Sequence, residues 1–246
     1  MRPNIHTNFI LSPITDILKD VVSASAGIGN GIETFPLCDY VMQSVFLKMT
    51  GFQEQKMKCV CWELATIDYE YRYDFTKVPL GECSSIKEKQ SIYKGLIEQI
   101  KKRSTNHQIF TSSQKNLILT KINNEILTVF NNTNLTIWSQ KRFNEYKSIW
   151  IGIEKKHFAS DENNLFTEIN NGVSLKEIYT EHLYKQRNRV AHNTQSYQQN
   201  LPTLKTLFND NYKFENYFIW FSTLILIDEI FIKLYKDYLN TFDDNL

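Results

Sequence analysis

The 246 residues of this chain carry 28 lysines and arginines against 27 aspartates and glutamates. That balance argues against a protein that coats nucleic acid with a globally basic surface, so any nucleic-acid binding must come from a local patch. No stretch reaches the roughly 20 apolar residues that a bilayer requires, and the N-terminus lacks the features of a signal peptide. We therefore expect a cytoplasmic protein that does not bind a membrane.

Apolar residues recur at three- and four-residue spacing along most of the chain, which predicts an all-α fold. Pro13 is expected within the early turns of the first helix, while Pro36 should open the second helix and Gly51 close it. Residues 52–75 alternate charged and apolar residues by turns, as a core helix does. Helices are expected in the first half over residues 8–25, 36–49, 52–75, 86–102 and 112–130.

The second half is predicted to hold a helix over residues 139–158 and two further helices around one informative motif. Ser174-Leu175-Lys176-Glu177 is a capping-box pattern, so a helix should begin there and run on toward residue 192. A final helix over residues 214–239 is apolar on nearly all sides and must be wrapped by other helices or by a second subunit. No repeat or linker forces a boundary, so we expect one domain over residues 1–246, with its motif region at 174–240.

The stretch Arg187-Asn188-Arg189-Val190-Ala191-His192 combines residue types that suit RNA cleavage. A ribonuclease can use the 2′-hydroxyl of its substrate as the nucleophile and then needs proton exchange and a cation, but no protein nucleophile. His192 can exchange protons near neutral pH. Arg187 can grip a phosphate through two N–H groups and stabilise the charge that develops on it. Asn188 can orient the imidazole or hold a ribose oxygen, so we assign these three residues as catalytic.

These residues resemble the HEPN superfamily, whose signature is R-x(4–6)-H, commonly with a polar residue after the arginine. The resemblance covers residues 174–238, where the motif helix is followed by a long apolar helix, and upstream it extends only to helical content. It implies a HEPN-like helical bundle, here with an elaborated N-terminal helical half. It also implies metal-independent endoribonuclease activity that leaves a cyclic phosphate, without a cofactor or metal, in bacterial toxin or antiviral defence systems.

The same resemblance implies a homodimer in which two motifs face each other, with tRNA, mRNA or rRNA as substrate and a regulatory or antitoxin protein as a possible partner. HEPN toxins that are paired with a minimal nucleotidyltransferase often carry a tyrosine two residues after the histidine. Thr194 occupies that position here, and Tyr197 is the nearest tyrosine. Control by modification of that tyrosine is therefore not expected.

Helix geometry constrains how the motif can work. Asn188 and His192 would lie about 40° apart around a straight helix, whereas Arg187 and His192 would lie about 140° apart. Either the helix bends or ends near residue 191, or the long arginine wraps around it, or the site combines two subunits. A dimer would also double the basic cluster of Lys185, Arg187 and Arg189, and we assign Lys185 and Arg189 to RNA binding.

The segment Gly51–Lys58 offers weaker candidates. From a neighbouring helix, Glu54 could orient the motif arginine, while Lys56 or Lys58 could bind phosphate; we assign Lys58 to RNA binding. The pattern alone favours a solvated helix face for all three. Glu63 and Asp68 are further carboxylates that could pair with an arginine, and spacing selects neither.

Two other functions remain open. One is a catalytically inactive HEPN-like module that binds RNA, a nucleotide or a protein, and retained RNA binding without cleavage would favour it. The other is a structural helical adaptor in which the motif is incidental. A monomer with Arg187 and His192 far apart on its surface would favour that second alternative.

Overall fold

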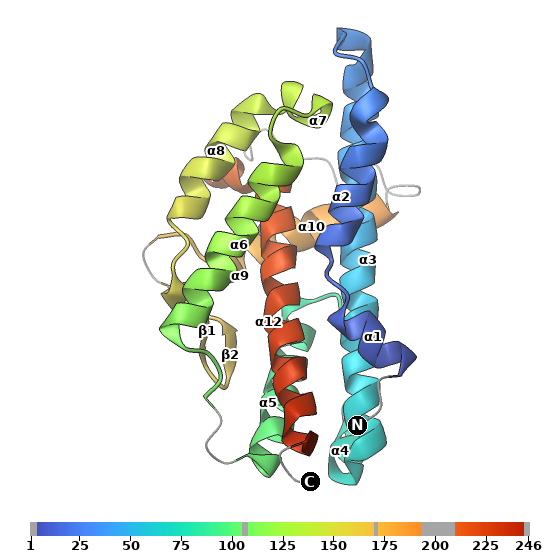
Figure 1. Cartoon of the computed structure of the whole chain (residues 1–246), viewed down its shortest axis with the longest axis vertical. Coiled ribbons are helices and arrows are strands. Elements are labelled where there is room, and N and C mark those ends of the chain that lie inside the picture. Colours follow the sequence, from blue (N-terminus) through green and yellow to red (C-terminus); the bar gives the residue numbers. More distant parts are fainter. Residues whose placement is uncertain (1–3, 105–107, 170–171, 193–209, 244–246) are drawn as a thin grey trace.

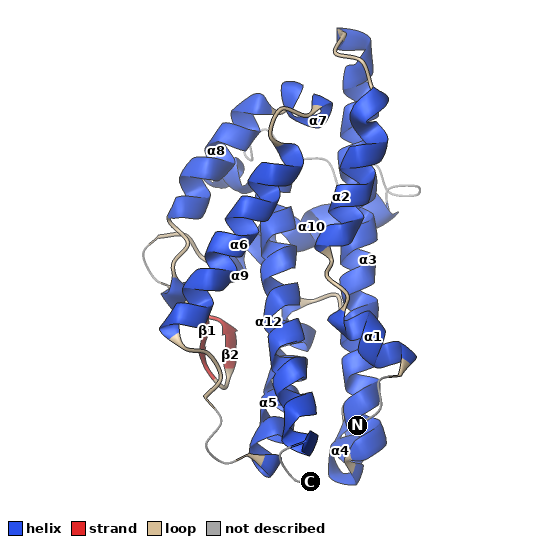
Figure 2. Ribbon diagram, in the orientation of Figure 1, coloured by secondary structure: helices blue, strands red, loops and turns tan. Residues whose placement is uncertain are grey.

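The computed structural model describes residues 4–104, 108–169, 172–192 and 210–243, and for His192, Asp210, Asn211 and Asp243 it describes the backbone only. Most of these residues are helical, as predicted (Figures 1 and 2). The exception that the sequence did not indicate is an antiparallel hairpin of β1 (Phe158–Asp161) and β2 (Asn164–Phe166). Within the described ranges, no helix is both long and apolar enough to cross a membrane.

The first predicted helix is divided in two. α1 (Ile5–Leu11) ends before Pro13, and α2 (Thr15–Ala24) begins after it. Ser12 adopts an extended conformation, with φ −70° and ψ 131°, because the ring of a following proline disfavours the helical region for the residue before it. The prediction of one helix over residues 8–25 was therefore wrong at Pro13.

α3 (Phe35–Ile67) is one helix of 33 residues and runs straight through Gly51, where we expected a helix end. Met49 and Met57, on either side of the glycine, are both fully buried in the same core. Their burial outweighs the penalty of about 1 kcal/mol for glycine inside a helix. The expected continuous helix over residues 52–75 was also wrong, because Asp68 leaves the helical conformation and caps α4 (Tyr69–Lys77).

α5 (Ile86–Arg103) and α6 (Ser112–Phe130) lie where they were predicted, and each begins with a complete capping box. α7 (Asn134–Ile137) and α8 (Gln140–Ile151) follow. The helix expected to reach residue 158 ends earlier because the chain enters the hairpin, whose turn is held by the Asp161 carboxylate accepting from the Asn163 amide at 2.7 Å. Short helical turns connect the larger elements: η1 (Ser25–Gly27), η2 (Ile32–Thr34), η3 (Lys155–His157) and η6 (Asp210–Phe214).

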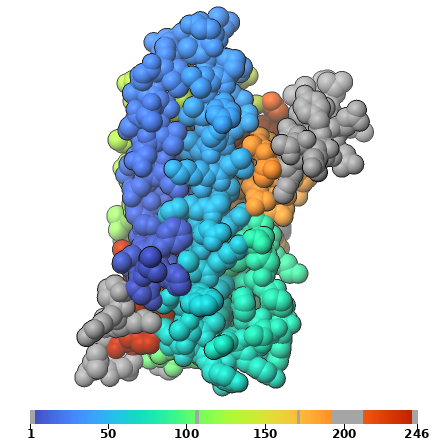
Figure 3. Space-filling model, turned by 90° about the vertical axis from the view of Figure 1, so that its right-hand side faces the viewer, coloured from blue at the N-terminus to red at the C-terminus, as the bar shows by residue number. Residues whose placement is uncertain are grey.

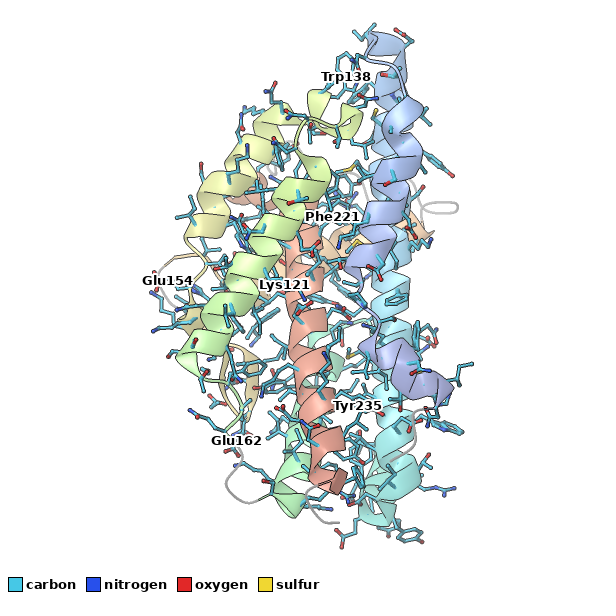
Figure 4. All side chains as sticks on the ribbon, viewed as in Figure 1. Lys121, Trp138, Glu154, Glu162, Phe221 and Tyr235 are labelled. Carbon is cyan, nitrogen blue, oxygen red and sulfur yellow. The ribbon has the colours of Figure 1, made fainter. Side chains whose placement is uncertain are left out.

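α12 (Tyr217–Asp243) is the central helix of the molecule, and α3, α5 and α6 pack around it (Figure 1). Of the two predicted ways of covering this apolar helix, other helices or a second subunit, the structure shows the first. Phe221 and Tyr235 of α12 point between the surrounding helices and are fully buried, whereas Glu154 and Glu162 lie at the periphery (Figure 4). One contiguous apolar cluster reaches from α1 to α12.

The motif region begins with α9 (Leu175–Glu177), continues through η4 (Ile178–Leu183) and ends with α10 (Tyr184–His192). α10 lies across the middle of α3 rather than alongside it (Figure 1). On the face of the molecule shown in Figure 3, α10 lies beside α3, with α4 and α5 at the lower end of the same face. This arrangement brings the motif against residues near position 54.

Candidate functional site

The motif helix starts where the sequence predicted. The Ser174 hydroxyl accepts a hydrogen bond from the Glu177 amide at 3.3 Å, as an N-cap residue does. The next turn, η4, is a π-helix, which places one more residue in the turn than an α-helix has and is frequent at functional sites. Tyr179, His182 and Leu183 of this turn are buried, so η4 fixes the base from which α10 projects.

Arg187 is held by a carboxylate from another helix. Its Nη2 lies 3.0 Å from Oε1 and 3.1 Å from Oε2 of Glu54 on α3. Glu54 is only 8% exposed, so the interpretation of residues 54, 56 and 58 as a solvated face was wrong for this residue. Its position instead fits the other interpretation, in which Glu54 orients the motif arginine. An ion pair in this partly buried setting is screened less than one on the surface.

The second motif residue also contacts the arginine. Arg187 Nη1 donates to Asn188 Oδ1 at 3.1 Å. Residues four apart lie on the same side of a helix, so Asn188 draws the guanidinium toward the strip of α10 that carries position 192. The side chain of His192, and all of Thr194 and Tyr197, lie outside the described residues, so two members of the predicted trio are together and the third is placed by its backbone alone.

A buried lysine that the sequence analysis missed lies behind the ion pair. Lys89 on α5 is 1% exposed, and its Nζ donates to the Cys83 carbonyl at 2.5 Å and lies 5.7 Å from the centre of the Tyr179 ring. Burial lowers the pKa of Lys89 to about 8, the charge of Glu54 opposes that shift, and Arg187 adds to it. Helical spacing could have revealed this lysine, because it shares the apolar face of α5 with residues 92, 93, 96 and 100.

A second carboxylate engages the other motif arginine. Glu215 lies 2.8 Å from Nδ1 of His182 through Oε1 and 3.2 Å from Nη2 of Arg189 through Oε2. His182 is buried, and Glu215 is the hydrogen-bond partner of its Nδ1. Arg189 is therefore tied to the segment that precedes α12, and an RNA phosphate would have to share it with Glu215.

The two predicted RNA-binding lysines also have acidic neighbours. Lys185 Nζ lies 2.6 Å from Glu181 Oε2, with both side chains more than half exposed, and Lys58 forms an ion pair with Glu82. Exposed pairs of this kind contribute about 0–1 kcal/mol and exchange readily for another anion. The structure thus places Lys185 on the surface of α10 and Lys58 on α3, one turn beyond Glu54.

The remaining candidates have structural partners. Lys56 is 1% exposed and pairs with Asp228 of α12 at 2.6 Å, so the solvated-face interpretation was wrong for it as well. Glu63 contacts His6 at 2.9 Å, and Asp68 pairs with a lysine of α5; among the described residues, neither carboxylate pairs with an arginine. In the part of the chain that the structure describes, no group of three or more His, Cys, Asp or Glu side chains is placed to share a metal ion.

Comparison with protein-family models, curated proteins and solved structures finds no match to this chain.

Proposed function

We propose that the chain is a HEPN-like, metal-independent endoribonuclease that cleaves RNA by attack of the 2′-hydroxyl and leaves a cyclic phosphate. The observation that carries the proposal is the anchored arginine of the RNRVAH motif. Arg187 is fixed between Glu54 and Asn188, yet its side chain remains 20% exposed. A preorganised cation at a partly open surface suits a reaction in which negative charge develops on phosphorus-bound oxygens.

The reaction assigns a separate task to each motif residue. The 2′-oxygen bonds to phosphorus as its proton passes to a base, and the bond from phosphorus to the 5′-oxygen breaks as that oxygen takes up a proton. His192 is the proton-exchanging group that the motif supplies. Arg187 binds the non-bridging phosphate oxygens, and Asn188 is a positioning residue that holds the guanidinium. A homodimer with two facing motifs would supply one histidine for each proton transfer.

Glu54 limits how a phosphate can approach. It occupies one terminal nitrogen of the guanidinium and compensates part of its charge. The substrate must therefore bind through the remaining N–H groups, which narrows the range of productive orientations. We assign Glu54 as a positioning residue that keeps Arg187 in one rotamer while the phosphate binds.

The test is cleavage of total RNA and purified tRNA in the presence of EDTA by the wild type, His192→Ala and Arg187→Ala. His6→Ala serves as a matched control, because His6 is a partly exposed histidine that pairs with Glu63. We expect cleavage by the wild type and the control, loss of at least a hundredfold in both motif variants, and cyclic phosphate ends on the products. A substrate with 2′-O-methyl groups should resist cleavage, because the nucleophile is blocked.

The pairing of Arg187 with Glu54 also favours one rival, a catalytically inactive module that binds RNA. In such a module the arginine would already have its anionic partner and would act mainly to stabilise the fold. Wild-type protein that binds RNA and leaves it intact under all conditions tested would support this module and contradict the nuclease. Cleavage that survives in His192→Ala would contradict the assigned mechanism.

A further inference from the structure

A pocket of about 460 Å³ opens on the molecular surface at the end of α3 that follows Glu54. The last turns of α3, the helix α4 and the segment before α5 enclose it. Its walls combine aromatic side chains with two cations. The residues that define its chemistry are Lys58, Trp62, Arg72, Phe75 and Glu82.

Trp62 presents an open ring at the wall of the pocket. Its side chain is 64% exposed, and its only ring neighbour among the described residues is His6, which meets it edge-on with centroids 6.2 Å apart. An exposed ring of this size offers apolar area on which a ligand can stack. Arg72 is exposed on the pocket wall and forms no ion pair with a described residue. An open aromatic face beside an uncommitted cation is the combination that binds an unpaired base and its phosphate.

Helix spacing places the pocket and the motif site on the same face of α3. Glu54, Lys58 and Trp62 follow each other at four-residue intervals, so they form one stripe in which Lys58 lies about 6 Å and Trp62 about 12 Å beyond Glu54. The stripe begins where Glu54 holds Arg187 and ends at Trp62 on the pocket wall. One short segment of a single strand can therefore reach both ends.

We propose that this pocket is a stacking site for an unpaired base of single-stranded RNA, a few nucleotides from the phosphate that Arg187 engages. The inference rests on the proposed ribonuclease function and adds to it a recognition site that favours unstructured RNA. Trp62 stacks on the base, and Arg72 and Lys58 bind backbone phosphates. Lys58 exchanges its partner Glu82, whose side chain is 75% exposed, for the phosphate.

The test measures binding apart from cleavage. The probe is a labelled single-stranded oligonucleotide with 2′-O-methyl groups, which a nuclease of this kind cannot cut, and the protein is the full chain. Trp62→Ala is compared with Trp62→Phe and with Tyr40→Ala, a matched control because Tyr40 is an equally exposed aromatic residue of α3 outside the pocket. Removal of an exposed side chain should not affect folding.

We expect Trp62→Ala to weaken binding about tenfold, which is the loss typical for one base stacked on an aromatic ring, while Trp62→Phe and Tyr40→Ala bind like the wild type. Arg72→Ala should weaken binding and reduce its dependence on salt. In the cleavage assay, Trp62→Ala should raise KM and leave kcat unchanged.

The outcomes separate this site from the proposed function. Cleavage by the wild type together with equal affinities for Trp62→Ala and Tyr40→Ala would overturn the stacking site and leave the nuclease standing. A wild type that neither binds nor cleaves the RNA would overturn both. A paired base cannot enter the pocket. If Trp62→Ala weakened binding of a fully double-stranded probe as much as binding of the single-stranded probe, the stacking site would also be overturned.

Discussion

Arg187 and Glu54 depend on each other at the residue scale. Both are largely buried at their point of contact, where the Arg187 Nη2 to Glu54 Oε1 distance is 3.0 Å. Replacing Glu54 by glutamine keeps the size and one acceptor but removes the charge. The guanidinium is then held less firmly, and a small displacement of a catalytic group lowers the reaction rate strongly.

We therefore expect Glu54→Gln to lower kcat for RNA cleavage by roughly ten- to a hundredfold, with a smaller change in KM. Glu125→Gln is the matched control, because Glu125 is a partly exposed carboxylate whose 3.0 Å pair with Lys19 lies outside the site. The measurement is steady-state cleavage of a defined oligonucleotide. A Glu54→Gln enzyme as fast as the control would show that Glu54 serves the fold alone.

Lys89 makes a distinct prediction about pH. Burial lowers its pKa in the folded protein to about 8 from an ordinary value near 10.5, so the folded state binds this proton more weakly than the unfolded state. The penalty is present in full below the folded pKa and disappears as the pH rises above the unfolded one. Lys89→Met removes this penalty, while the stability of the wild type should approach that of the variant as the pH rises.

The expected size is roughly 2 kcal/mol: the difference in the free energy of unfolding between Lys89→Met and wild type should shrink by that amount between about pH 7 and about pH 10. Denaturant titrations at several pH values measure it, and the tyrosines and cysteines that also titrate are common to both proteins. A difference that does not change with pH would mean that Lys89 is solvated in the folded state.

At the scale of elements, one buried ion pair joins three helical segments. Lys56 of α3 and Asp228 of α12 are each 1% exposed, and the second oxygen of Asp228 accepts from the Ile14 amide at 2.9 Å, just before α2. Burial lowers the pKa of Lys56 and raises that of Asp228, although each attracts the other. The pair therefore fixes the relative positions of the helices and leaves an uncompensated charge if one partner is removed.

We expect Lys56→Met to lower the free energy of unfolding by about 3–5 kcal/mol, because it strands the Asp228 carboxylate in the core. The double variant Lys56→Met/Asp228→Asn should recover most of that loss, since the amide still accepts from the Ile14 backbone. Urea unfolding of the wild type, both single variants and the double variant measures the coupling. Additive losses in the double variant would show that the two side chains act independently.

These elements also show what the sequence could predict. The capping boxes before α5 and α6 and the Ser174 cap are local signals, and the helices begin where they indicate. The predictions of a helix end at Gly51 and of a continuous helix through Pro13 were wrong for opposite reasons. Burial on both sides carries α3 through the glycine, whereas the backbone restriction imposed by the proline ends α1 despite a continuous apolar pattern.

The candidate site was predictable only in part. The motif located Arg187 and Asn188, but the partner of Arg187 is 133 residues away in the sequence. Glu54, Glu63 and Asp68 were all candidate partners for an arginine, and only the fold brings Glu54 against α10. Periodicity within one helix cannot indicate which face of another helix it will meet.

At the scale of the whole molecule, the near-neutral net charge has a local counterpart, because the basic side chains around the motif are paired with carboxylates. Arg187, Arg189, Lys185 and Lys58 each have a carboxylate partner, so this face does not form a large positive field. Electrostatic attraction of RNA is then weaker than for a basic protein, and recognition must depend more on stacking and on specific phosphate contacts. For the proposed nuclease, this predicts that the substrate is selected by its exposed bases.

The proposed homodimer can be tested by the chemistry of its histidines. Each motif supplies one histidine, whereas the reaction needs one group to accept a proton and another to donate one. If two facing His192 side chains share these tasks, a dimer of one wild-type and one His192→Ala subunit, isolated with two different tags, should retain far less than half of the wild-type activity. A dimer of wild type with His6→Ala is the control and should remain fully active. Half activity in the first dimer would mean two independent sites, and a monomeric mass by light scattering would contradict the shared site altogether.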